Sequence, residues 1–87
     1  MTKLERLLMD EGYYSVTLLP TGEYCALMVM AFTTGLFVGL DEINYRTRYC
    51  YPTFIDAMEA IEQWRGIGDP PGPWIKQKPE NRLNPKL

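Results

Sequence analysis

The 87-residue sequence contains no histidine. Without an imidazole side chain there is no Ser-His-Asp or Cys-His nucleophile pair, no histidine general base and no zinc site of the usual Cys/His type. The one serine, Ser15, has no neighbouring base that the sequence reveals. An enzyme would have to work with carboxylates or tyrosines alone. We therefore predict a non-enzymatic protein that uses no metal and no cofactor.

Positive charge is also scarce. The chain has 9 lysines and arginines against 11 aspartates and glutamates, so its formal net charge is −2. Residues 1–66 hold five basic and nine acidic side chains (net −4), whereas residues 67–87 hold four basic and two acidic ones (net +2). Such a molecule lacks the basic surface that drives non-specific binding to nucleic acid. Nucleic-acid binding is therefore ranked behind protein binding.

Cysteines are few and long apolar runs are missing. Cys25 and Cys50 could form at most one disulfide, and the apolar run over residues 25–32 is far shorter than the about 20 residues that a membrane helix needs. The first apolar residues are interrupted by charge, which does not fit a signal peptide. We expect a cytoplasmic protein with reduced thiols and no membrane contact.

What the sequence does contain is the composition of one small globular domain, with 46% hydrophobic and 13% aromatic residues. Thr2 and Glu5 fit a capping box at the start of a helix, Gly12 would end that helix, and Gly39 is a candidate β-bulge. The residue pattern predicts helices over 3–9 and 54–65 and strands over 13–18, 23–32, 36–40 and 45–51.

These elements predict an α+β fold, in which a short N-terminal helix and a C-terminal helix pack on a four-stranded antiparallel β-meander. Residues 1–66 would form the domain and residues 67–87, which hold five of the seven prolines, a tail. Alternation places Tyr14, Val16 and Leu18 on one face of the first strand. In the fourth strand it separates Tyr45, Thr47, Tyr49 and Tyr51 from Arg46, Arg48 and Cys50.

The second strand is apolar on both faces, so both faces need a cover. One face would carry Tyr24, Ala26, Met28 and Met30, and the other Cys25, Leu27, Val29 and Ala31. Either the two helices, or one helix and the tail, cover the two faces, or a homodimer forms through Tyr24, Met28 and Met30. We favour cover by the chain itself, because Trp74 in the tail is suited to close a core.

Two groups of charged residues are candidate sites. Asp41 and Glu42 lie in a loop after a strand, where carboxylates often do acid-base or metal work, although a solvated turn explains them more simply. Arg46 and Arg48 share a strand face that could meet a nucleic-acid groove. Because Glu23 and the acidic loop would oppose phosphate, salt bridges across the sheet are the favoured role of these arginines.

The tail is the most individual part of the sequence. Prolines hold an extended path, so the segment over residues 68–76 can deliver Trp74 to a pocket at a low entropic cost. Either the tail straps back across the domain, or Trp74 and Lys76 are presented to another protein. We favour the strap, in which case Trp74→Ala should cost about 3–5 kcal/mol of stability.

Three segments carry a family resemblance: GDPPGPWIK at 68–76, GLFVGLDE at 35–42 and RYCY at 48–51. They resemble a group of short uncharacterised proteins from proteobacteria and their phages or prophages. The resemblance implies an accessory protein that binds and blocks a host protein, for example an inhibitor of a host defence complex of the anti-CRISPR kind. The alternative is a small nucleic-acid-binding module that uses its sheet face. The candidate partner-binding residues are Asp41, Glu42, Arg46, Arg48, Trp74 and Lys76.

Overall fold

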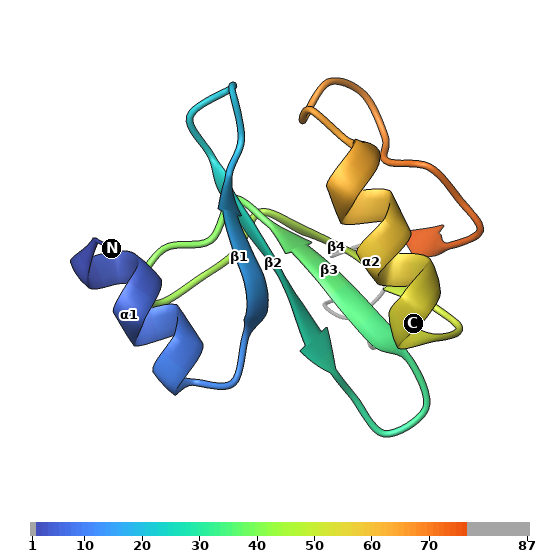
Figure 1. Cartoon of the computed structure of the whole chain (residues 1–87), viewed down its shortest axis with the longest axis horizontal. Coiled ribbons are helices and arrows are strands. Elements are labelled where there is room, and N and C mark those ends of the chain that lie inside the picture. Colours follow the sequence, from blue (N-terminus) through green and yellow to red (C-terminus); the bar gives the residue numbers. More distant parts are fainter. Residues whose placement is uncertain (1, 77–87) are drawn as a thin grey trace, which may run out of the picture.

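The computed structural model describes residues 2–76. The elements are α1 (Lys3–Asp10), β1 (Tyr14–Leu18), β2 (Tyr24–Val29), β3 (Thr34–Val38), β4 (Thr47–Tyr51), α2 (Phe54–Gln63) and β5 (Ile75–Lys76). The strands form one antiparallel sheet in the order β1-β2-β3-β4-β5 (Figure 1). The predicted α+β fold, with a short N-terminal helix, an antiparallel meander and a C-terminal helix, is confirmed.

Helix α1 begins and ends as its local sequence predicts. The Thr2 hydroxyl accepts a hydrogen bond from the backbone N–H of Glu5 (3.1 Å), and the Glu5 carboxylate accepts one from the N–H of Thr2 (3.0 Å). This reciprocal capping box satisfies two of the free N–H groups at the helix start. Beyond the other end, Gly12 adopts a φ of +104°, which a residue with a side chain rarely does.

The strict alternation predicted for the first strand is wrong. The pairing of β1 with β2 shifts register between Tyr14 and Thr17, where Ser15 has a φ of +55°. This extra residue turns Tyr14 to the side of α2, where its ring meets Phe54 at a centroid distance of 5.7 Å. Val16 packs on the side of α1 instead. A bulge therefore separates two residues that period-two alternation puts together.

The two faces of the sheet carry separate cores, and each is covered by one helix. On the α2 side the buried residues of the core are Leu19, Cys25, Leu27, Leu36, Val38, Tyr49, Tyr51, Ala57, Ala60, Ile61 and Trp64. On the α1 side they are Leu8, Ala26, Phe37 and Leu40, with Tyr24, Met28 and Met30 among the partly buried residues around them. This explains why β2 is apolar on both faces, as a central strand covered on both sides must be.

Strand β4 begins later than predicted. Thr47, Tyr49 and Tyr51 are buried on the α2 side, as the alternation indicates. Tyr45 lies outside the strand and packs on the α1 side, where its ring meets Phe37 edge-on at 4.8 Å. The expectation that Tyr45 shares a face with the other three residues is therefore wrong.

Helix α2 ends at Gln63, two residues before the predicted end. Trp64 leaves the helix with an extended backbone (ψ 142°) and is only 7% exposed. Its indole N–H donates to the carbonyl of Ile67 at 3.2 Å. The side-chain N–H of Arg65 donates to the carbonyls of Glu62 and Trp64, both at 3.4 Å. Burial of the tryptophan thus ends the helix earlier than its sequence alone indicates.

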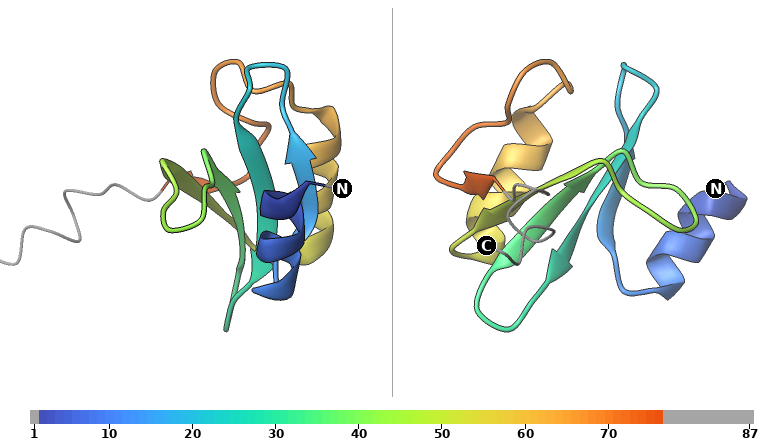
Figure 2. Two further views of the ribbon diagram at one scale, coloured as in Figure 1. Left: turned by 90° about the vertical axis from the view of Figure 1, so that its left-hand side faces the viewer. Right: turned by 180° about the vertical axis from the view of Figure 1, so that it is seen from behind.

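The described part of the tail, residues 67–76, adds a fifth strand that was not predicted. Ile75 pairs with Cys50 and Lys76 with Tyr49, so β5 forms the outer strand opposite β1. Figure 2 shows it as the short orange-red arrow beside β4. Two residues that follow a proline-rich stretch carry no periodic signal, and only their pairing with β4 makes them a strand.

Candidate protein-binding site

The described part of the tail is held to the sheet by two buried tyrosines. The Tyr49 hydroxyl donates to the carboxylate of Asp69 at 2.8 Å, and the Tyr51 hydroxyl donates to the backbone carbonyl of Pro71, also at 2.8 Å. Both rings belong to the α2-side core. Because each hydroxyl needs a partner when it is buried, the tail satisfies polar groups that the sheet cannot satisfy by itself.

Trp74 packs against the same core. Its ring meets Tyr49 edge-on at a centroid distance of 4.8 Å, and its indole N–H donates to the carbonyl of Pro70 at 2.7 Å. The side chain is partly buried. Part of the indole therefore contacts the core, while the side chain also lines a surface groove.

Alkaline pH should destabilise the protein through these tyrosines. Burial, followed by the hydrogen bond to Asp69, raises the pKa of Tyr49 to about 12 from the ordinary 10.0, and burial also raises the pKa of Tyr51. A group whose pKa is raised by folding contributes stability that is complete below its unfolded pKa and is lost as the pH rises through its folded pKa. The melting temperature should therefore fall between pH 10 and 12, and less steeply in Tyr49→Phe than in wild type.

An apolar groove of about 470 Å³ lies next to Trp74, between the β2–β3 turn and β5. We call it the Phe32 groove. It is lined by Phe32, Thr33, Cys50, Tyr51, Pro52, Pro73, Trp74 and Ile75. Phe32 is 92% exposed and Ile75 is 77% exposed, so two large apolar side chains stand in solvent at its rim. An exposed apolar cluster of this kind is typical of a surface that binds another protein.

The exposure of Phe32 follows from its place in the β2–β3 turn. Strand β2 ends at Val29, and the N–H of Met30 donates to the carbonyl of Thr33 at 2.8 Å, which closes the turn. Phe32 lies inside that turn, where no helix or strand covers it. The largely apolar run over residues 23–32 predicts a strand that includes Phe32, so the sequence does not indicate that this side chain is exposed. The sequence also predicts a turn at Thr33-Thr34-Gly35, directly after Phe32, but Thr34 and Gly35 are the first residues of β3 and only Thr33 lies in the turn.

The arginines predicted on the sheet face are engaged within the chain. Arg46 forms a two-point ion pair with Glu23, its Nε and Nη2 atoms each 2.8 Å from a carboxylate oxygen, and this contact lowers the pKa of Glu23. The guanidinium of Arg48 lies 5.7 Å above the centre of the Phe37 ring. The pair of Arg46 and Glu23 is the salt bridge across the sheet that the sequence favours.

The acidic loop is organised around its own backbone. One carboxylate oxygen of Asp41 accepts the N–H groups of Ile43 (2.8 Å) and Asn44 (2.7 Å), and these bonds, the one to Asn44 first, lower the pKa of Asp41. Glu42 is exposed. A pocket of about 410 Å³ lies between this loop and Leu4 of α1. Asp41 thus has a structural role in its turn.

The six candidate residues do not form one site. Asp41 and Glu42 lie in the β3–β4 loop, whereas Trp74 packs on the α2 side and Lys76 is the last residue of β5. Arg46 lies in the same β3–β4 loop, one residue before β4, and Arg48 lies within β4. Of the six, only Trp74 lines the Phe32 groove.

Within residues 2–76 there is no group of three or more Cys, Asp or Glu side chains that could hold a metal ion. In the same range no helix is long and apolar enough to span a membrane. Comparisons of the chain with protein-family models, with curated proteins and with solved structures found no match.

Proposed function

We propose that the protein is a non-enzymatic binding protein that attaches to another protein through the Phe32 groove. The observation that carries this proposal is the exposure of Phe32 (92%) and Ile75 (77%) beside one apolar groove. Burying a phenylalanine side chain in an interface is worth about 1.5–3 kcal/mol. Two such side chains around a pocket have the composition of an interface hot spot, where a few apolar anchors carry most of the binding energy.

The groove also has the size and chemistry to receive a side chain of the partner. Its volume of about 470 Å³ falls within the range of ordinary ligand pockets, about 300–1,000 Å³. Apart from the Thr33 hydroxyl and the Cys50 thiol, its lining side chains are aromatic or aliphatic. The hydroxyl of Tyr51 already donates a hydrogen bond to the carbonyl of Pro71 in the tail. A partner with an exposed leucine, isoleucine or phenylalanine would suit it.

The resemblance to phage and prophage proteins extends the proposal to a biological setting. In that setting the protein is an accessory factor that binds a host protein, as an inhibitor of a host defence complex would. The net charge of −4 over residues 1–66 favours a partner with a basic surface. Defence complexes that hold nucleic acid have such surfaces.

Affinity capture from a lysate of the proteobacterial host tests the proposal. The tagged full-length protein is expected to retain one host protein in stoichiometric amount. If no stoichiometric partner is retained, the proposal is contradicted.

Nucleic-acid binding is the alternative function, and we expect the protein not to bind DNA or RNA. Arg46 is paired with Glu23 and Arg48 lies over Phe37, so the sheet face offers little charge to phosphate. Gel shifts with DNA and RNA at low salt should show no complex. A shift that disappears at moderate salt would instead support nucleic-acid binding, because phosphate contacts are weakened by salt.

A homodimer through Tyr24, Met28 and Met30 is a further alternative. All three side chains are partly buried around the α1-side core, and the Tyr24 hydroxyl donates to the carboxylate of Glu5 in α1 at 3.0 Å. Tyr24 is thus held by the helix, and Met28 and Met30 already pack within the chain. Sedimentation at micromolar concentration distinguishes the dimer from a monomer.

A further inference from the structure

The outer edge of β1 is the second surface with features of a binding site. β1 is the end strand of the sheet, and within residues 2–76 no strand pairs with its outer side. The N–H of Leu19 donates to the carbonyl of Glu23 at 2.8 Å, and Leu18 lies opposite Tyr24. Because hydrogen-bonded pairs alternate along an antiparallel ladder, the backbone N–H and C=O of Leu18 point away from β2.

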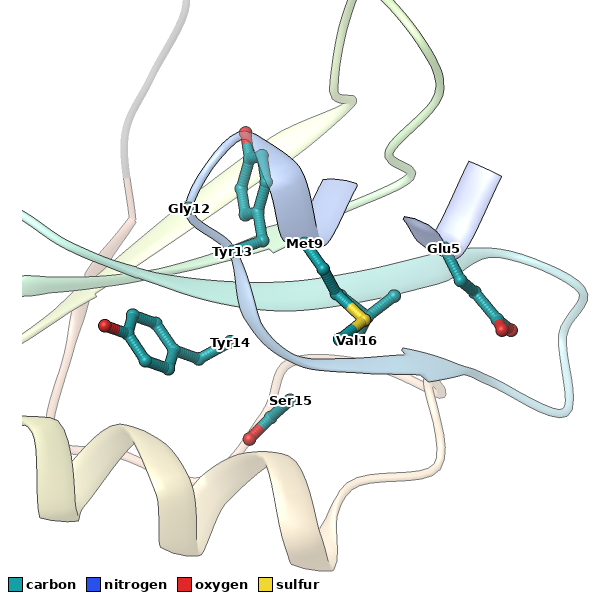
Figure 3. A pocket seen from close by; sticks show the side chains of 7 residues that line it. All are labelled: Glu5, Met9, Gly12, Tyr13, Tyr14, Ser15 and Val16. Carbon is teal, nitrogen blue, oxygen red and sulfur yellow. The ribbon is translucent and has the colours of Figure 1, made fainter. Parts of the chain in front are cut away.

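Two hollows accompany this edge, one on each side of the strand. Figure 3 shows the first, of about 550 Å³, in which Met9 of α1 points toward Val16 of β1 while Ser15 points toward α2. The second hollow, of about 560 Å³, lies between β1 and α2, and Met58 and Glu62 are the residues of α2 that line it together with Ile61. In Figures 1 and 3 β1 runs between the two helices. An open strand edge thus has a hollow and a helix on either side, and we call this edge with its two hollows the channel.

The two hollows match the side-chain pattern of an added strand. Val16 lines both hollows, and successive side chains of a strand point to opposite faces, so a strand that pairs with β1 at Val16 would direct neighbouring side chains to the two hollows. Exposed apolar side chains beside β1 could contact the added strand: Met9 is 48% exposed, Tyr14 is 55% exposed and Leu18 is 54% exposed. The free backbone groups of the edge would supply the hydrogen bonds.

The charge of the side chains that line the channel indicates which kind of peptide would bind as an added strand. Residues 3–11 around α1 carry two basic and three acidic side chains, and residues 54–65 around α2 carry one basic and three acidic ones. Of these side chains, Glu5 lines the first hollow and Glu62 and Arg65 line the second, which gives the lining a net charge of −1. The carboxylate of Glu5, which lines the first hollow, has a lowered pKa because of its hydrogen bonds to Thr2 and Tyr24 and so stays charged. Basic side chains on the incoming strand would be attracted.

We propose that the outer edge of β1 binds an extended segment of a partner protein, in which apolar side chains alternate and lysine or arginine residues are interspersed. The bulge at Ser15 limits the ladder to the stretch from Val16 onward. A short, interrupted edge resists uncontrolled pairing between sheets and leaves a site for one short peptide. β1 and β5 are opposite edges of the sheet, so this site is separate from the Phe32 groove and does not depend on the proposed function.

Selection of peptides tests this proposal. A random linear peptide library displayed on yeast is sorted against the full-length protein, and an enriched peptide is synthesised. We expect enriched sequences with period-two apolar residues and net positive charge. N-methylation of a backbone amide that faces β1 should weaken binding about five- to tenfold, because it removes one hydrogen bond. N-methylation of the next amide, which faces away, serves as the matched control.

Variants of the protein provide a second test of the proposal. Glu62→Gln is expected to lower the affinity of the protein for the enriched peptide. Glu42→Gln, in the distant β3–β4 loop, should leave that affinity unchanged. Phe32→Asp should also leave it unchanged, which separates this site from the groove. The proposal is overturned if no peptide is enriched, if the enriched peptides show helical spacing, or if N-methylation has no effect. It is also overturned if a peptide of residues 77–87 binds equally well, which would assign the channel to the chain's own C-terminal segment.

Discussion

Replacing Trp74 by alanine is expected to lower the free energy of unfolding by about 3 kcal/mol. Truncating a tryptophan in a core costs about 3–5 kcal/mol, and the lower end applies because Trp74 is only partly buried. The variant loses the ring contact with Tyr49 and the hydrogen bond to Pro70. Urea denaturation monitored by circular dichroism measures the change.

A matched variant shows whether the effect comes from the tail's contact with the core. Ile75→Ala changes the next residue, which is 77% exposed, and should alter stability by no more than about 0.5 kcal/mol. If Trp74→Ala unfolds at the same urea concentration as wild type, the tail does not stabilise the domain. Trp74 would then be better described as a ligand for a partner.

Leu8→Ala should have a similarly large effect, a loss of about 3 kcal/mol, for a different reason. Leu8 is 1% exposed and is the only fully buried residue of α1. Its removal leaves a cavity in the small α1-side core, next to Phe37 and Leu40. Thermal and urea unfolding measure the loss.

The neighbouring leucine provides the control for Leu8. Leu7 has the same chemistry but is 36% exposed, so Leu7→Ala should cost less than about 1 kcal/mol. Equal losses in the two variants would mean that helix propensity, and not the docking of α1, sets the stability of this half of the protein. Because α1 forms one wall of the channel beside β1, Leu8→Ala should also weaken peptide binding there.

Local signals account for the parts of the fold that were predicted correctly. The capping box of Thr2 and Glu5, the glycine at position 12 and the helical spacing of Phe54, Met58 and Ile61 each act within a few residues of sequence. Such signals depend little on the rest of the molecule. They were sufficient to predict both helices.

The failures share a non-local cause. Ser15 takes a positive φ because β1 must meet β2 in a bulged register, and Trp64 leaves its helix because its indole is buried. Residues Ile75 and Lys76 become a strand only by pairing with β4. None of these contacts has a counterpart in local periodicity.

The candidate site was predicted only in part for the same reason. Trp74 was singled out because a lone tryptophan among prolines is conspicuous in sequence. Phe32 was not, because it ends an apolar run that looks like a continuous strand. Only the closure of the turn between Met30 and Thr33 exposes it. The Phe32 groove itself joins a turn, a strand and the tail, which are brought together by folding.

Affinity capture with two matched variants is the most direct test of the proposal that the Phe32 groove binds a host protein. Phe32→Asp places a charge at the groove, whereas Ile43→Asp makes the same kind of change at an 86% exposed residue in the β3–β4 loop. Equal melting temperatures would show that both variants fold. We predict that the partner retained by wild type is also retained by Ile43→Asp and is lost with Phe32→Asp. Undiminished capture by Phe32→Asp would contradict the account.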